Sequence, residues 1–160
     1  MVGLGPGETG EILVRGSHIM KGYYKNETAT NETIAKNGWL KTGDIGYYKD
    51  SQFYITDRLK ELIKVKGFQV APAELEEVLR SHPHVADAAV IGVPNPVSGE
   101  LPRGYVVAKP NVKINEEDVL NYVQTKVAVY KRLESVVVIN EIPKNATGKI
   151  LRRELKLQFK

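Results

Sequence analysis

Lysines are the side chains of this sequence whose spacing points most directly to chemistry. Lys64 and Lys66 stand two residues apart in residues 62–66, which read as a strand, so both would project from one face. Gly67 follows and would let the backbone approach a ligand closely. Two cations on that face suit a polyanionic substrate. Lysines also protect a solvated edge strand from pairing, and spacing alone leaves both interpretations open.

A further lysine, Lys149, ends a polar, glycine-containing loop over residues 143–149. Such a loop can deliver an ammonium group to a phosphate, where it acts as a point charge. An ordinary turn before a basic helix would have the same composition. Asp44 follows a glycine at the end of a strand-like stretch, and a carboxylate there could accept hydrogen bonds from both hydroxyls of a ribose.

Composition and charge limit the other classes of function. The 160 residues are 42% apolar and 26% charged, which is typical of a globular protein, and no cysteine is present to form disulfides or thiolate metal sites. The net charge of +4 is mild and favours small anionic ligands over nucleic acid. No apolar run approaches the ~20 residues of a membrane span. His82 and His84 have no further metal-ligand residues near them in sequence, so we predict a helix-end role and no metal site.

The pattern of elements changes along the chain. Residues 1–57 read as β structure, with strands over 10–16, 39–42 and 52–56, a turn at 49–51, and one short helix over 25–36. Later residues alternate helix and strand: helices begin at Pro72 and after Asn115, strands cover 85–93, 105–108 and 136–139, and a helix covers 150–157. The predicted fold class is α+β, with a break near residues 57–61.

Five segments carry a family resemblance when they are taken in order. They are GEILVRG at 10–16, GYY at 22–24, GWLKTGD at 38–44, DRLKELIKVKGFQVAPAELE at 57–76 and PKNATGK at 143–149. In this order the chain resembles the C-terminal part of adenylate-forming enzymes, which include acyl-CoA synthetases, 4-coumarate–CoA ligases and insect luciferases. The long middle segment is most similar to the coumarate-ligase and luciferase-like branch.

The resemblance implies a two-step ligase. A carboxylic acid attacks the α-phosphate of ATP, and the thiol of coenzyme A then displaces AMP from the acyl-adenylate. It also implies that residues 1–57 end a large N-terminal domain as a β subdomain, that residues 58–61 form a hinge, and that residues 62–160 form a small C-terminal lid. Mg²⁺ would accompany ATP and be held mainly by the N-terminal domain.

The resemblance also implies roles for individual residues. Lys149 and Lys64 would be catalytic, Lys149 in adenylation and Lys64, with Gln69, in the arrangement that forms the thioester. The nucleotide would be bound by Asp44, Arg58, Lys60 and Gln69, with Asp44 on the ribose hydroxyls and Lys60 as the hinge. Lys66 and Gly67 would line the channel for coenzyme A.

The family's phosphate-binding loop, adenine motif and acid-binding pocket have no counterpart in this sequence. We therefore expect a fragment that acts through a parent N-terminal domain and has no adenylation activity alone. Two alternatives stay open: oxidation of an acyl-adenylate by a luciferase-like parent, and a non-catalytic module that binds a nucleotide, coenzyme A or a partner. The expected compartment is the cytoplasm. Residues 157–160 differ from the S-K-L address, although a peroxisomal site stays possible.

Overall fold

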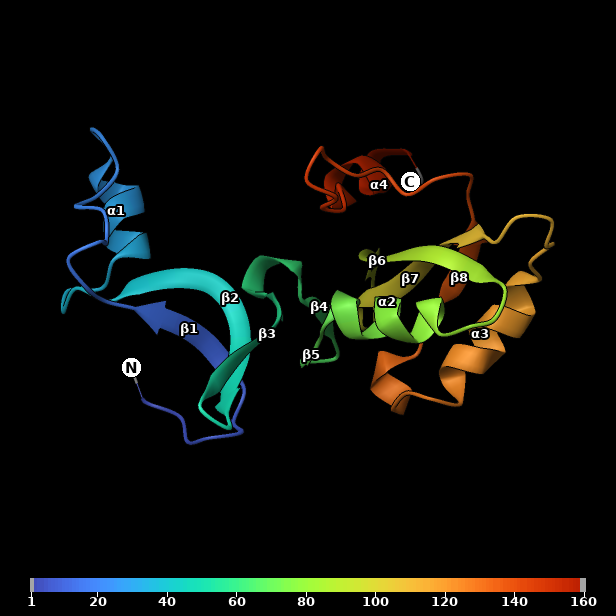
Figure 1. Ribbon diagram of the computed structural model, residues 1–160, viewed down its shortest axis with the longest axis horizontal. Coiled ribbons are helices and arrows are strands. Elements are labelled where there is room, and N and C mark those ends of the chain that lie inside the picture. The colour runs from blue at the N-terminus through green and yellow to red at the C-terminus, as the bar shows by residue number, and fades with distance from the viewer. Residues whose placement is uncertain (1, 159–160) are drawn as a thin grey trace. The chain divides into compact units, whose positions relative to one another are not determined.

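The computed structural model describes residues 2–158 and divides into two compact units, Met1–Lys60 (unit 1) and Glu61–Lys160 (unit 2) (Figure 1). Both contain helices and sheets that are mainly antiparallel, so the predicted α+β class is confirmed. The boundary between the units falls within the predicted hinge at 58–61. Phe159 and Lys160, half of the segment compared with the peroxisomal address, lie outside the described residues.

Unit 1 is a three-stranded antiparallel sheet in the order β1-β2-β3, with one short helix. The tight turn between β2 and β3 contains Asp50 and Ser51 with φ of 50° and 62°, the left-handed pair that suits a two-residue hairpin. Asn26 caps the helix by accepting a hydrogen bond from the backbone N–H of Ala29 at 3.0 Å. The elements are β1 (Gly10–Val14), α1 (Glu27–Thr33), β2 (Leu40–Lys49) and β3 (Gln52–Arg58).

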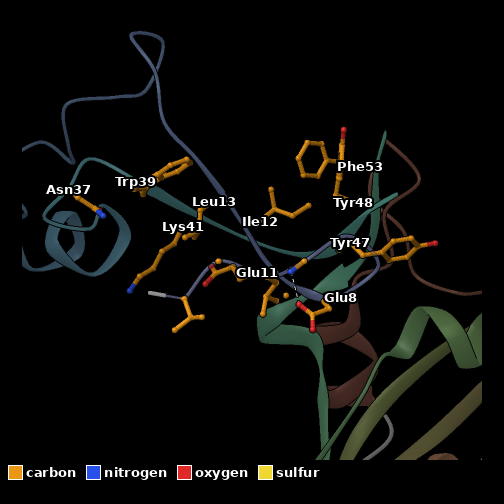
Figure 2. A pocket seen from close by; sticks show the side chains of 16 residues that line it. Glu8, Glu11, Ile12, Leu13, Asn37, Trp39, Lys41, Tyr47, Tyr48 and Phe53 are labelled. Carbon is orange, nitrogen blue, oxygen red and sulfur yellow. Dashed lines mark hydrogen bonds between the residues drawn. The ribbon is translucent and has the colours of Figure 1, made fainter. Parts of the chain in front are cut away.

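Apolar burial in unit 1 is sparse. Among its described residues, Ile45 is the one buried hydrophobic side chain, at 8% exposure. Trp39 and Phe53 instead line an open, largely apolar pocket of about 600 Å³ on the sheet (Figure 2). The described residues of unit 1 therefore form little apolar core of their own, although a domain of this size normally needs one.

Unit 2 contains a five-stranded sheet that has helices on both faces. Its strands run in the order β5-β4-β7-β6, and β8 pairs with β7 in parallel. A short 3₁₀ turn, η1 (Leu59–Glu61), leads into the unit. The remaining elements are β4 (Ile63–Val65), β5 (Phe68–Val70), α2 (Pro72–Arg80), β6 (Val85–Asn95), β7 (Gly99–Ala108), α3 (Glu116–Gln124), η2 (Val129–Lys131), β8 (Ser135–Val138) and α4 (Arg152–Gln158).

The two faces of this sheet bury separate apolar clusters because side chains alternate along a strand. In β6, Ala88 and Val90 belong to the cluster that α2 and α3 cover, whereas Ala89 and Ile91 belong to the second cluster. Helix α4 contributes Leu155 to that second cluster. The predicted lid region therefore has a core of its own, unlike unit 1.

The structure also corrects several predicted boundaries, among them those of the strand over residues 62–66 and of the helix over residues 25–36. The strand expected over residues 62–66 ends at Val65, and Lys66 and Gly67 form a two-residue turn with φ of 48° and 85°. Lys66 therefore does not project from the same strand face as Lys64. The helix expected over residues 25–36 is limited to Glu27–Thr33. No helix within residues 2–158 has the length and apolar character that a bilayer crossing requires.

His82 lies just past the C-terminal end of α2, as expected, and only 8% of the residue is exposed. Its ring meets the rings of His84 and Tyr122 edge-on, and its Nδ1 accepts a hydrogen bond from the His84 backbone N–H at 3.2 Å. Burial lowers the pKa of His82, the charges of His84 and Lys109 lower it further, and Asp118 opposes them. His82 is therefore packed as a neutral group.

We predict that this burial makes unit 2 sensitive to acid. Below about pH 6.5 the unfolded chain protonates this histidine while the folded unit resists the proton, so stability falls as the pH is lowered. One proton contributes at most about 1.4 kcal/mol per pH unit. His82→Asn keeps an acceptor and should flatten the decline in unfolding free energy between pH 6.5 and 5, whereas His18→Asn, at an exposed site, should not. Equal slopes for His82→Asn and the parent would contradict the prediction.

Candidate functional site

The loop that carries Lys149 is short and fixed at both ends. Ile142 and Ile150 pack in the cluster beneath α4, and Lys144 pairs with Ile150 as an isolated antiparallel bridge. The Lys144 ammonium lies 2.6 Å from a carboxylate oxygen of Asp87 on β6. The predicted loop over residues 143–149 is therefore an ordered hairpin mounted on the sheet.

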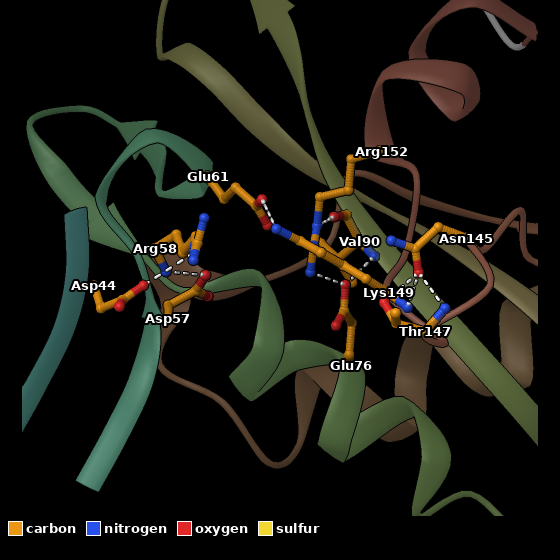
Figure 3. Close-up of polar contacts among 10 residues, drawn as sticks. All are labelled: Asp44, Asp57, Arg58, Glu61, Glu76, Val90, Asn145, Thr147, Lys149 and Arg152. Atoms are coloured by element: carbon orange, nitrogen blue, oxygen red, sulfur yellow. Dashed lines mark hydrogen bonds and ion pairs between the residues drawn. The ribbon is translucent and has the colours of Figure 1, made fainter. Parts of the chain in front are cut away.

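The Lys149 side chain extends from this hairpin into solvent. Its exposure is 48%, and its Nζ lies 4.0 Å from Oε1 of Glu61 (Figure 3). A pair this long between partly exposed groups contributes little to stability. The ammonium group can therefore leave Glu61 for a stronger anionic partner.

Beneath Lys149, Arg152 at the start of α4 holds several groups together (Figure 3). Its guanidinium contacts Glu61 at 2.5 Å and Glu76 at 2.6 Å, and its Nε donates to the Val90 carbonyl at 3.2 Å. The Val90 N–H donates to Glu76 at 2.9 Å. Because β6 is an edge strand, Arg152 and Glu76 occupy backbone groups that the sheet leaves unpaired.

Glu76 makes Arg152 indispensable to this arrangement. Burial raises the pKa of Glu76, while the charge of Arg152 and the Val90 N–H oppose that increase. An ionised carboxylate at this depth needs a paired cation, because an isolated buried charge is strongly destabilising.

The β4–β5 hairpin presents the other predicted residues. Lys64 and Gln69 are directly opposite each other in the antiparallel register and both are exposed, so they share one face of the hairpin. The backbone N–H of Lys64 donates to Glu100 at 3.0 Å. Lys66 and Gly67 form the exposed tip of the hairpin.

In unit 1 the structure brings together two residues that the sequence analysis singled out. Asp44 on β2 and Arg58 on β3 are register partners, and the Arg58 Nε lies 3.0 Å from a carboxylate oxygen of Asp44 (Figure 3). Thr42 and Gly43, whose φ is 73°, shape the bend before Asp44, and the Thr42 hydroxyl accepts from the Asp44 N–H at 3.0 Å. Lys60 is exposed in the 3₁₀ turn that follows Arg58.

Sequence reasoning did not identify Glu61, Arg152 or Asn145 as site residues. Arg152 was one of several cations in a basic helix, and its partners Glu61 and Glu76 lie 91 and 76 residues away. No local pattern signals such a pairing. Asn145 does carry a local signal, since asparagine side chains commonly accept hydrogen bonds from the backbone two residues ahead. Residues 2–158 contain no group of three or more His, Asp or Glu side chains arranged to hold a metal ion.

Comparison with known proteins identifies the class. Residues 74–149 match the model of the AMP-binding enzyme C-terminal domain. The chain is 56% identical over 155 residues to a probable 4-coumarate–CoA ligase 3 of Dictyostelium discoideum, covering 96% of this chain and 28% of that protein. It is 50% identical to peroxisomal OPC-8:0-CoA ligase 1 of Arabidopsis thaliana, over 95% of this chain and 28% of the ligase.

Two further relatives extend the comparison. Luciferin 4-monooxygenase of Photuris pensylvanica is 51% identical over 98% of this chain and 29% of its own length. The crystal structure of ATP-bound MatB from Rhodopseudomonas palustris superposes with a TM-score of 0.91 at 30% identity, over 98% of this chain and 31% of that one. The chain spans less than a third of the length of each of these proteins.

These matches define unit 2 as an AMP-binding enzyme C-terminal domain. The chain belongs to the adenylate-forming enzymes and corresponds to their C-terminal part, as the resemblance implied.

We predict that unit 2 depends on the Arg152 ion pairs for its stability. Arg152→Ala leaves Glu76 buried without its cation and should lower the free energy of unfolding by about 3 kcal/mol. The neighbouring Arg153 is exposed, so Arg153→Ala should change it by less than about 0.5 kcal/mol. Chemical denaturation followed by far-ultraviolet circular dichroism measures both. Similar midpoints for Arg152→Ala and Arg153→Ala would contradict this role.

Proposed function

We propose that this chain is the C-terminal part of an ATP-dependent acid–thiol ligase of the acyl-CoA synthetase type. In the first step a carboxylate oxygen attacks the α-phosphorus of ATP, and the bond to pyrophosphate breaks. In the second step the thiol of coenzyme A attacks the acyl carbon and AMP leaves. The similarity to 4-coumarate–CoA ligases supports this chemistry.

The observation that carries the proposal is the presentation of two lysines by separate ordered elements of unit 2. Lys149 extends from the hairpin before α4 with 48% of its side chain exposed, and Lys64 lies exposed on the β4–β5 hairpin opposite Gln69. We assign Lys149 to adenylation, where its ammonium balances charge on the α-phosphate and the acid. Lys64 and Gln69 serve thioester formation, and the Lys66–Gly67 tip approaches coenzyme A. Cations presented in this way act by positioning and charge stabilisation.

We propose that unit 1 also carries nucleotide-binding residues. We propose that the Asp44 carboxylate accepts hydrogen bonds from the ribose hydroxyls while Arg58, its 3.0 Å partner, holds it in place. Lys60 is the proposed hinge, because the boundary between the two compact units follows it directly. A hinge of one or a few residues would let one lid serve both steps.

The remainder of the ligase would lie outside this chain. The chain covers 28% of its coumarate-ligase relative, and unit 1 buries a single hydrophobic side chain among its described residues. We propose that a large N-terminal domain covers the sheet of unit 1 and holds Mg²⁺ with ATP and the carboxylic acid. The cytoplasm is the proposed compartment, and similarity to a peroxisomal ligase supports the peroxisome as the second candidate.

Oxidation of an acyl-adenylate is the second candidate function. The 51% identity to luciferin 4-monooxygenase favours it specifically. The two candidates differ in what consumes the adenylate, so the substrate of the second step distinguishes them. Consumption of coenzyme A supports the ligase, and light emission with luciferin and oxygen supports the alternative.

We predict that the two lysines act in different steps. In a full-length ligase whose C-terminal part is this chain, Lys149→Ala should slow pyrophosphate release by about 10²–10³-fold and spare thioester formation from supplied acyl-adenylate. Lys64→Ala should show the opposite pattern. Lys113→Ala, at an exposed position on unit 2, is the matched control and should change neither step. Equal losses in both steps from either variant would refute the division of roles.

A further inference from the structure

The backbone of Lys149 is held by one residue, Asn145. The Asn145 amide oxygen accepts hydrogen bonds from the Thr147 N–H at 3.0 Å, the Thr147 hydroxyl at 2.8 Å and the Lys149 N–H at 2.8 Å (Figure 3). The Asn145 backbone N–H donates to the Lys149 carbonyl at 2.9 Å, and the Asn145 carbonyl accepts from the Gly148 N–H at 2.9 Å.

These bonds fix the direction in which the lysine leaves the loop. The backbone N–H and carbonyl of Lys149 are both paired with Asn145, so the direction of its Cα–Cβ bond cannot change without breaking these hydrogen bonds. Gly148 completes the turn with φ of 81°, a conformation that favours glycine. Beyond Cβ, the polar contact shown within residues 2–158 is the 4.0 Å approach of Nζ to Glu61.

Asparagine suits this position because its short side chain carries an acceptor that reaches the N–H groups two and four residues ahead. An alanine removes all three side-chain bonds. The sequence Asn145-Ala146-Thr147 also fits the pattern of a glycosylation acceptor. The structure instead assigns this motif an internal use, since its amide and its hydroxyl are bonded to each other.

We infer that Asn145 is the positioning residue of the adenylation lysine, an inference that rests on the proposed function. It touches no reactant and acts by pre-setting the path of the ammonium group to the α-phosphate. A displacement of about 1 Å in a reacting group can cost roughly 10²-fold in rate. Loss of Asn145 should therefore impair adenylation while leaving the fold and the second step intact.

The first measurement follows the loop itself in the full chain. Amide hydrogen exchange by NMR should show the Lys149 N–H exchanging about 5–10-fold faster in Asn145→Ala than in the parent, because this amide loses its hydrogen-bond acceptor. Asn145→Asp keeps the acceptor and should restore the protection. Asn140→Ala, at an exposed position close to the loop, should match the parent. Unchanged protection in Asn145→Ala would overturn the inference.

The second measurement uses the full-length ligase that contains this chain. Asn145→Ala should lower kcat for pyrophosphate release by about 10–100-fold with little change in the KM for ATP, and thioester formation from supplied acyl-adenylate should stay at the parental rate. An unchanged kcat, or an equal loss in both steps, would overturn the positioning role. If the parental ligase releases no pyrophosphate, the proposed function fails. The adenylation role of Asn145 then fails too, even if hydrogen exchange shows that Asn145 protects the Lys149 N–H.

Discussion

The ion pair between Arg152 and the buried Glu76 is the interaction on which the rest of unit 2 depends. Glu76 belongs to α2, which covers one face of the sheet. Arg152 begins α4, and Leu155 of that helix packs on the other face. Glu76 and Arg152 pair with each other, and each forms a hydrogen bond with the Val90 backbone on the unpaired edge of β6. A buried carboxylate tolerates ionisation only with such a partner. The pair therefore joins the two layers and sets where the hairpin before α4 can lie. Glu61 joins the same guanidinium, so the first residue of unit 2 is fixed to the body of the unit.

This attachment has a consequence for movement. Because Glu61 is bonded to Arg152, it must turn with unit 2, and any pivot has to lie before it in the sequence. Lys60 is the last residue of unit 1 and is exposed. We therefore keep the proposed hinge at Lys60, one residue before unit 2 begins. The same Glu61 carboxylate lies 4.0 Å from the Lys149 ammonium, so the first residue of unit 2 lies beside the proposed adenylation lysine.

Local signals predicted the parts of this fold that depend on local physics. Pro72 begins α2, Asn115 caps α3, and the polar residues 143–149 form a loop, because each follows from backbone preference within a few residues. The strand over residues 62–66 was predicted too long, since alternation of Lys64 and Lys66 cannot distinguish a strand from a strand followed by a left-handed turn. The ion pairs of Arg152 could not be found from sequence. Glu61 and Glu76 lie 91 and 76 positions before Arg152, and only tertiary packing brings residues so far apart into contact. Spacing singled out Lys149 and Lys64 and family resemblance supplied their roles, whereas the amide that organises Lys149 emerged only from the folded loop.

We propose that this chain supplies a preformed lid and that the chemistry requires the remainder of an adenylate-forming ligase. Pyrophosphate release from ATP and a carboxylic acid tests it most directly, measured for the chain alone and for the chain joined to the preceding part of its 56%-identical coumarate-ligase relative. The account predicts no release by the chain alone and acid-dependent release by the joined protein. Release by the 160-residue chain alone, or none by a correctly folded joined protein, would contradict it.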